Sequence, residues 1–364
     1  MFNSNHYIPI LKWKRAEQSA LANLTNEKKV YITPLIQFVM PKQKPNDNLE
    51  DVIEKFKKQS NSIPDKIVEA WGKDPIFVDF SLLYTTELKI DSIKSILENG
   101  MQKQAILIPV IHLDDDDKIK QVVCSLARKA NGLCLRLVCP DFLDSQRLND
   151  SIQEFIQKYG IDESKIDLLV DVKELGGDAN KYKKYFDLSQ NIINLPKWRT
   201  FIFSGGTFPK NLSLCKKDEE NLIPRVEWKE WNNCISNSSV LRKPSFSDYT
   251  IQYPIYEESS QFFHPTSSIK YTLDEDWLIM KGQRRKPELY LANAALLIQD
   301  VKYSGENFSF GDKYIIEKAN YFPKYMEAKN KGTDLKGTGS TETWLISGIN
   351  HHMTLVATQI SSQP

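Results

Sequence analysis

The segments AILIPVIH (residues 105–112), LCLRLV (133–138) and IDLLVDV (166–172) decide the fold expected for this chain. Each is short and largely apolar, without the strict alternation of polar and apolar residues that marks a strand with one face in water. A strand that is apolar on both faces is buried on both, which is typical of parallel strands covered by helices. The three segments therefore predict a parallel sheet with helices packed outside it.

Similar apolar runs recur along two thirds of the chain. In order, the eight runs span residues 7–13, 30–39, 76–80, 105–112, 133–138, 166–172, 200–203 and 249–253. Between them, apolar residues recur at helical spacing, as with Leu49, Val52, Ile53 and Phe56. Eight alternations of strand and helix predict an α/β fold, a TIM-like (β/α)8 barrel, with an open doubly wound sheet as the alternative.

The pattern changes beyond residue 256, which suggests three parts. We expect a barrel core over 1–256, an inserted or appended α+β region over 257–341, and a C-terminal helix over 342–364 that packs back on the barrel. Within the second part, 270–282 reads as a strand pair and 287–300 as a helix.

Composition excludes few functions but limits the location. The 48 basic and 47 acidic residues nearly cancel, so net charge favours neither a nucleic-acid nor a membrane surface. The five cysteines show no CxxC spacing, which favours reduced thiols. The first 11 residues lack the pattern of a signal peptide, and no run approaches the roughly 18 apolar residues of a membrane span. We therefore expect a cytoplasmic protein without membrane contact.

Polar residues occur in or just after several of the predicted strands, where burial would otherwise exclude them. They are Lys12, Lys14, Glu17, Asp79, His112, Arg136, Asp171, Ser204, Gly205 and Gly206. The carboxyl ends of barrel strands share one face, so these groups are expected to meet there. Glycines after the seventh strand and the nearby cations predict an anion site, whereas buried ion pairs such as Arg136 with Asp171 or Asp79 are the purely structural alternative.

No complete catalytic signature accompanies these groups, because HExxH, GxSxG, GxxxxGK[ST] and a GxGxxG after a strand are all missing. The candidates for acid, base or nucleophile are Lys14, Glu17, Asp171 and His351. No cofactor is predicted, although Asp79, Asp171 and Asp248 offer the oxygen ligands that a divalent cation prefers. The four aspartates at 114–117 are expected to begin a helix rather than to bind a metal. Adjacent His351 and His352 differ by about 100° on a helix, so one is expected to face inward and one outward.

Short motifs in a fixed order along nearly the whole chain resemble the "beta protein" family of phages and bacterial genomic islands. The matching residues are Tyr7 to Lys14 with Glu17, Trp198-Arg199, Ser204 to Pro209, Pro224-Arg225, Glu227-Trp228, Ser247-Asp248-Tyr249, Ile269-Lys270-Tyr271-Thr272, Gly311-Asp312, Trp344 and Gly348 to His352. Lys270 and Ala16 depart from the family's usual arginine and glycine. Lysine lacks the planar fork of arginine, so a bidentate anion contact is not expected at Lys270.

The resemblance implies a barrel-like fold and a role in anti-phage or toxin-restraining modules, without an established reaction. It also implies that seven positions cluster, namely Lys12, Lys14, Glu17, Arg225, Asp248, Tyr271 and His351. Arg225 and Tyr271 thereby join the expected ligand-binding set. The first hypothesis is a defence component that binds a partner protein from the same gene cluster, or a trigger ligand, at the barrel face. An enzyme acting on a phosphorylated nucleotide or nucleic-acid end is the alternative, and duplex DNA binding is a weaker third reading.

Overall fold

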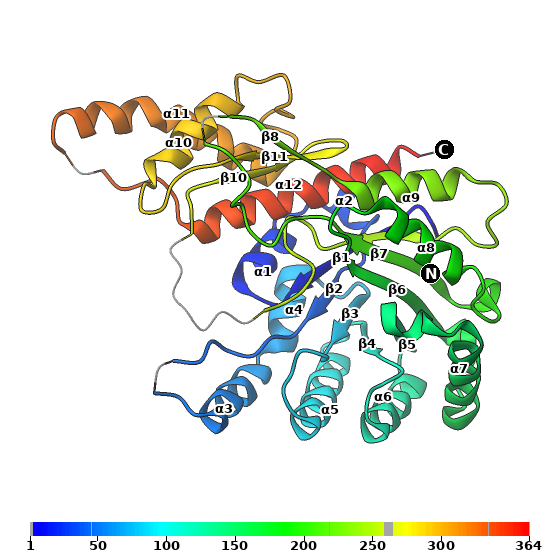
Figure 1. Cartoon of the computed structure of the whole chain (residues 1–364). Helices are drawn as coiled ribbons and strands as arrows, with labels where there is room; N and C mark the ends of the chain where they lie inside the picture. The colour runs from blue at the N-terminus through cyan, green and yellow to red at the C-terminus, as the bar shows by residue number, and fades with distance from the viewer. Residues whose placement is uncertain (1–2, 45, 218, 258–264, 334, 364) are drawn as a thin grey trace.

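The computed structural model describes residues 3–44, 46–217, 219–257, 265–333 and 335–363. Eight parallel strands close into a barrel in the order β1-β2-β3-β4-β5-β6-β7-β9 (Figure 1). Their bounds are Tyr7–Lys12 (β1), Leu35–Gln37 (β2), Ile76–Asp79 (β3), Leu107–Ile111 (β4), Leu133–Val138 (β5), Ile166–Glu174 (β6), Thr200–Gly206 (β7) and Ser245–Asp248 (β9). The closed barrel confirms the predicted fold class over the open sheet.

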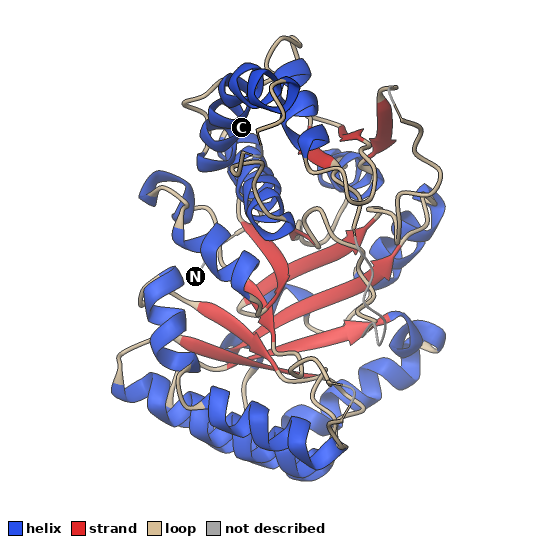
Figure 2. Ribbon diagram, turned by 90° about the vertical axis from the view of Figure 1, so that its left-hand side faces the viewer, coloured by secondary structure: helices blue, strands red, loops and turns tan. Residues whose placement is uncertain are grey.

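Helices follow the strands and lie outside them (Figure 2). Their bounds are Arg15–Ala22 (α1), Asn26–Lys29 (α2), Leu49–Ser60 (α3), Ile63–Trp71 (α4), Thr86–Gln102 (α5), Asp117–Lys129 (α6), Ser145–Tyr159 (α7), Ala179–Ser189 (α8) and Val226–Ser236 (α9). Short 3-10 turns cover Cys139–Leu143, Glu163–Lys165 and Leu195–Lys197. At the start of α6, the Asp116 side chain accepts a hydrogen bond from the Lys118 amide, as expected of a helix-capping aspartate.

The prediction for the eighth strand was wrong, because β9 covers Ser245–Asp248 rather than 249–253. The chain leaves the barrel at Thr250, whose φ of 57° is left-handed. Ser245 and Ser247 interrupt the apolar pattern of β9, and their hydroxyls donate to the carbonyls of Asn3 and Ile8. A strand with hydroxyls tied to the backbone lacks the apolar signal of the other seven.

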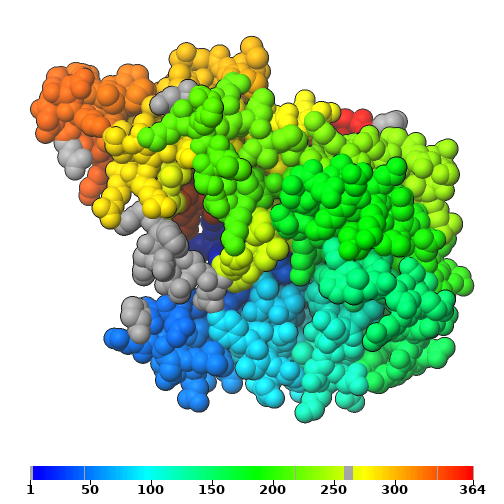
Figure 3. Space-filling view, in the orientation of Figure 1, coloured from blue at the N-terminus to red at the C-terminus, as the bar shows by residue number. Residues whose placement is uncertain are grey.

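A small antiparallel sheet and two helices form a lobe beside the barrel (Figure 3). The elements are β8 (Asn221–Pro224), β10 (Ile269–Thr272), β11 (Asp276–Met280), α10 (Glu288–Leu297) and α11 (Phe310–Asn330). The β10–β11 hairpin and α10 match the expected strand pair and helix, whereas α11 had not been predicted. β8 lies within the range expected for the barrel, yet it pairs with β11 in the small sheet. The three-part division by residue range stays a prediction.

The last helix, α12 (Thr341–Ser361), runs between the barrel and the small sheet (Figure 1). It contacts α1 and β1 of the barrel, and also β10 and α11 of the lobe. In chain order it follows the last barrel strand after the inserted lobe, so it takes the place of the eighth barrel helix. Its residues from Ser347 to Ala357 are all buried, which fits a helix covered on both sides.

Candidate functional site

The interior of the barrel is apolar in its middle and polar at the carboxyl ends of the strands. The middle is filled by one buried cluster, comprising Ile8, Ile10, Leu35, Phe77, Ile108, Val110, Cys134, Leu169, Ile202 and Tyr249. Because side chains alternate along a strand, the residue two positions beyond each of several cluster members faces the same interior. Those positions hold Lys12, Gln37, Asp79, His112, Arg136, Asp171 and Ser204. The strands therefore place one layer of polar groups, here called the mouth layer, at one end of the barrel.

Arg136 holds the centre of the mouth layer through an ion-pair network. Its Nη1 donates to Asp79 Oδ2 at 2.5 Å, and its Nη2 donates to Asp171 Oδ2 at 2.6 Å and to the Tyr249 hydroxyl at 2.9 Å. All four side chains are buried. Burial alone would raise the pKa of Asp79, but the Arg136 charge, His112 and the hydrogen bonds from Ser81 together outweigh burial and lower that pKa to about 2. Arg136 therefore forms the buried ion pairs with Asp79 and Asp171 that were considered as the purely structural alternative.

Lys12 differs from Arg136, because its hydrogen-bond partner among the described residues is a neutral group. Its Nζ donates to Gln37 Oε1 at 2.6 Å, and Gln37 Nε2 in turn donates to Asp79 Oδ2 at 3.0 Å. Within the described ranges, no carboxylate lies at ion-pair distance from Lys12 Nζ. The side chain is only 6% exposed. Burial, followed by the positive charge of Arg136, lowers the pKa of Lys12 to about 7.

A cavity of about 340 Å³ opens at the mouth layer. It is lined by Lys12, Gln37, Ser81, Leu82, Lys89, His112, Asp114, Asp115, Arg136, Val138, Lys173, Tyr249, Pro254, Ile255 and Tyr256. His112 Nε2 is buried and has no hydrogen-bond partner in the described part of the chain. Burial is the largest cause of the lowered pKa of His112, so the neutral imidazole is favoured. The cavity thus combines an amine, an imidazole and further lysines at the end where barrels bind ligands.

Lys14 and Glu17 lie next to this cavity rather than in its lining. The exposed Lys14 places its Nζ 4.8 Å from the ring centre of Tyr256, and Lys12 lies 5.9 Å from the same ring. Glu17 is buried on α1, where its Oε1 accepts a hydrogen bond from Gln252 at 2.6 Å. Burial raises the pKa of Glu17. The N-terminal segment therefore brings three of the predicted groups to one side of the barrel mouth.

The stretch Ser204-Gly205-Gly206 continues β7 and is buried. A side chain on Gly206 would meet Pro254 at 2.7 Å, and one on Gly205 would meet Leu175 at 3.1 Å. The following amide, of Thr207, already donates to the Glu227 carboxylate at 3.1 Å. These glycines therefore permit close packing. The neighbouring Thr207 amide donates its hydrogen bond to a carboxylate of the protein instead of to a bound anion.

The remaining predicted residues, Arg225, Asp248, Tyr271 and His351, lie in a second group that we call the α12 interface. Asp248 accepts hydrogen bonds from Tyr7 at 2.6 Å and from His352 Nε2 at 2.8 Å. Although burial opposes it, the His352 contact contributes to a lowered pKa of Asp248. Arg225 donates to the carbonyls of Leu273 and Asp274 at 3.0 Å. The seven family positions therefore form two groups and not one.

The prediction that one of the two histidines on α12 faces outward was wrong, since both are fully buried. His351 directs Nδ1 at Asp312 and Nε2 at the Thr272 carbonyl, both at 2.8 Å. Both ring nitrogens of His351 therefore have a protein partner, one on the lobe helix α11 and one on β10. His352 faces Asp248 and the Thr272 hydroxyl, and burial lowers its pKa. The lobe covers the helix face that the barrel leaves open, which sequence spacing alone did not reveal.

The aspartates considered for a cation are held by protein groups. Asp79 and Asp171 pair with Arg136, and Asp248 pairs with His352. In the ranges that the structure describes, no three His, Cys, Asp or Glu side chains are arranged to hold a metal ion.

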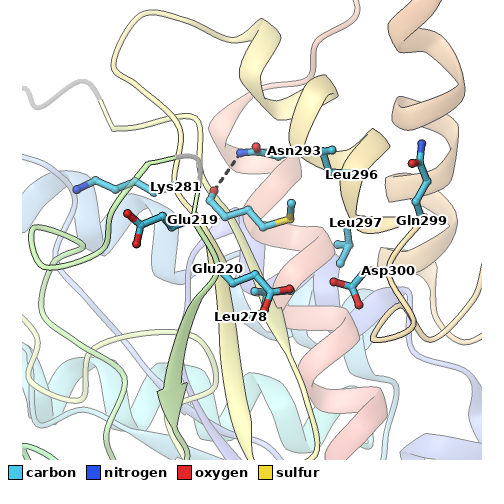
Figure 4. A pocket seen from close by; sticks show the side chains of 10 residues that line it. Glu219, Glu220, Leu278, Lys281, Asn293, Leu296, Leu297, Gln299 and Asp300 are labelled. Atoms are coloured by element: carbon cyan, nitrogen blue, oxygen red, sulfur yellow. Dashed lines mark hydrogen bonds between the residues drawn. The ribbon is translucent and has the colours of Figure 1, made fainter.

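A larger cavity, of about 450 Å³, lies in the lobe between β11 and α10 (Figure 4). Leu278, Met280 and Leu297 contribute apolar lining, and Asn293 donates to the Met280 carbonyl at 3.1 Å. Its acidic groups Glu220 and Asp300 both pair with Lys302. The carboxylates of this lobe cavity pair with lysines, and the cavity lies away from the strand ends of the barrel. The barrel mouth is therefore the stronger candidate despite its smaller volume.

The fold and the mouth layer define the class of the protein, a TIM-like barrel with a polar pocket at the carboxyl ends of its strands. The chain belongs to the Beta protein family, whose model matches residues 7–358. No curated protein matches it. Among solved structures it is similar to DHODH from Eimeria tenella in complex with ferulenol, at 11% identity and a TM-score of 0.27. That match covers 49% of this chain and 55% of the other. No described helix is long and apolar enough to cross a membrane.

Proposed function

We propose that the barrel mouth binds a small anionic ligand, and that the protein is a cytoplasmic component of an anti-phage defence or toxin-restraining module. In this proposal the ligand is a trigger, and a partner protein from the same gene cluster responds to its binding. The defence setting is what the resemblance to this family implies, and the family match itself names no function. The ligand site is supported by the geometry of Lys12.

Lys12 is the single observation that carries the ligand site. A buried ammonium group is costly unless a negative charge compensates it. The carboxylates of Asp79 and Asp171 are engaged by Arg136, whereas Lys12 contacts the amide of Gln37. A phosphate or carboxylate in the cavity would supply the missing charge, with Lys89 and Lys173 lining the same space.

Ligand binding is tested by calorimetric titration with inorganic pyrophosphate. We expect Lys12→Met to weaken binding at least about tenfold, since a charge-assisted contact is worth about 1.5–3 kcal/mol. The matched control is Lys66→Met on α4, which removes an equal charge from an exposed position. Equal affinity of both variants for pyrophosphate would contradict the assignment of the site to Lys12.

The module is tested by purifying the protein from cells that express its whole native gene cluster. Mass spectrometry of the purified material is expected to identify a second chain encoded in the cluster, together with an anionic small molecule that is absent from Lys12→Met. A monomer free of any partner and any small molecule would contradict the proposal.

An enzyme acting on a phosphorylated nucleotide or nucleic-acid end is the second candidate. The observation that favours it is His112 Nε2, a buried and unpaired nitrogen on the cavity wall that is suited to general acid–base chemistry. Incubation with nucleoside phosphates is then expected to give phosphate release that His112→Gln lowers at least about 100-fold. If the wild type releases no phosphate, the enzyme hypothesis is contradicted and the ligand-binding proposal is unaffected.

A further inference from the structure

The surroundings of Lys12 are those of a reactive lysine amine. Its Nζ lines a cavity, so a ligand atom can reach it. Its hydrogen-bond acceptor, Gln37 Oε1, carries no charge that would hold a proton on the amine. Aromatic rings flank it, with the centre of Tyr249 at 5.3 Å and that of Tyr256 at 5.9 Å.

Some charged groups around Lys12 favour its neutral form, and others favour its protonated form. The Arg136 guanidinium repels a proton on Lys12, whereas Asp79, Asp171 and Glu17 attract one. Two of those three carboxylates bind Arg136 directly, which weakens their attraction for Lys12. Burial adds to the effect of Arg136, and together they leave Lys12 with a pKa of about 7. The neutral amine is therefore far more populated at neutral pH in Lys12 than in a lysine of ordinary pKa.

We propose that Lys12 is a nucleophile that forms an imine with a ligand bearing both a carbonyl group and an anionic group. This inference rests on the proposed ligand site at the barrel mouth and names the chemical class of the ligand. A buried lysine amine beside another cation is the arrangement that activates it toward carbonyl compounds. The anionic group would lie toward Lys89 or Lys173, which line the same cavity.

The reaction balances without an oxidant or reductant. The lone pair of the neutral Nζ forms a bond to the carbonyl carbon, and the C=O π pair moves to oxygen, which takes up a proton. The nitrogen loses a proton, the hydroxyl group is protonated, and water leaves as the nitrogen lone pair forms the C=N bond. The iminium nitrogen then loses its remaining proton, so the two protons gained by the oxygen equal the two lost by the nitrogen. His112 lines the same cavity, and its buried Nε2 has no hydrogen-bond partner among the described residues, so we assign it the transfer of these protons. The products are one imine and one water.

The test is reductive trapping at pH 7 with glyoxylate, a small anionic aldehyde, and cyanoborohydride. Surface lysines, with pKa values near 10.4, hold about 1,000-fold less free amine than Lys12 at this pH. A less basic amine is also a weaker nucleophile, which offsets part of that advantage. We therefore expect Lys12 to be labelled at least about tenfold faster than any other lysine in peptide mapping by mass spectrometry.

The matched controls separate reactivity from folding. Lys12→Arg is expected to remove the fast label, whereas Lys66→Arg, at an exposed position on α4, is expected to retain it. The wild type supplies a measurement that needs no variant, because labelling of Lys12 should reach half of its maximal rate near pH 7. Labelling of Lys12 that rises only above pH 9, or no faster than that of surface lysines, would overturn the inference.

Failure of the inference and failure of the proposed function give different results. Pyrophosphate contains no carbonyl group and cannot form an imine. If it binds in a Lys12-dependent way but Lys12 is not labelled quickly, the anion site is supported and the imine is contradicted. Fast labelling of Lys12 without pyrophosphate binding would support the amine chemistry and remove the general anion site.

Discussion

The barrel mouth and the α12 interface are both rich in buried charge, but they use it differently. At the α12 interface, Asp248 and Asp312 each have an imidazole partner at 2.8 Å. At the mouth, Arg136 is paired in the same way, but Lys12 and His112 face a cavity of about 340 Å³. A set of charged residues at strand ends therefore does not by itself define a site. The unpaired group beside a space is what distinguishes a ligand site from an ion pair that holds elements together.

The largest effect is expected from Asp312→Ala at the α12 interface. Asp312 accepts hydrogen bonds from Tyr271 at 2.7 Å, from Ser309 at 2.5 Å and from His351. Removing it takes a hydrogen-bond partner from the buried His351 ring and from two hydroxyls, so the free energy of unfolding should fall by about 3–5 kcal/mol. Urea denaturation measures this change. A loss below about 1 kcal/mol would show that the interface is not the paired structural region described here.

A smaller loss is expected from Gly311→Ala at the contact of α11 with α12. An added Cβ would lie 2.2 Å from the Ser347 carbonyl oxygen, so the two helices must separate. We expect a loss of about 1–3 kcal/mol, as for other overpacked contacts. The control is Gly72→Ala, where no atom lies within 4 Å but φ is 96°. Its backbone strain of about 1 kcal/mol gives the reference for a glycine replaced without a clash.

The pH dependence of the free energy of unfolding tests whether Lys12 at the barrel mouth lacks the charge partner that the α12 interface groups have. Its pKa falls from 10.5 to about 7 on folding, so between these values the unfolded chain binds more protons than the folded one. Stability from this group therefore rises with pH above 7, by at most about 1.4 kcal/mol per unit. The buried Lys270, with a pKa lowered to about 8, acts in the same direction. Denaturation of the wild type and Lys12→Met between pH 7 and 9 should show a smaller slope in the variant, and equal slopes would contradict the assignment.

The smallest effect on stability is expected from Lys12→Met at pH 7. The variant removes a buried amine that has no carboxylate at ion-pair distance among the described residues, so the free energy of unfolding should fall by less than about 1 kcal/mol. The same variant should lose pyrophosphate binding, as proposed above. A large loss of stability would place Lys12 with the structural ion pairs instead.

The barrel could be predicted from the sequence because seven of its strands are nearly continuous apolar runs. The eighth was misplaced because Ser245 and Ser247 mask its pattern, and α11 was missed among glycine- and lysine-rich segments. The polar groups of the mouth, including Lys12 and Arg136, were predicted from their places at strand ends. Gln37 was missed, although a polar residue inside an apolar run is a recognisable signal. The α12 interface depends on contacts between residues more than 100 positions apart, which no local pattern contains.

The most direct test of the account is an NMR titration of Lys12, with lysines labelled with carbon-13 at Cε and the signal assigned by comparison with Lys12→Arg. The account predicts a pKa of about 7 for Lys12 in the free protein and a higher pKa when inorganic pyrophosphate is bound. A pKa near 10.4 that pyrophosphate does not change would contradict the central claim, which is that Lys12 at the barrel mouth lacks a negatively charged partner until an anionic ligand binds.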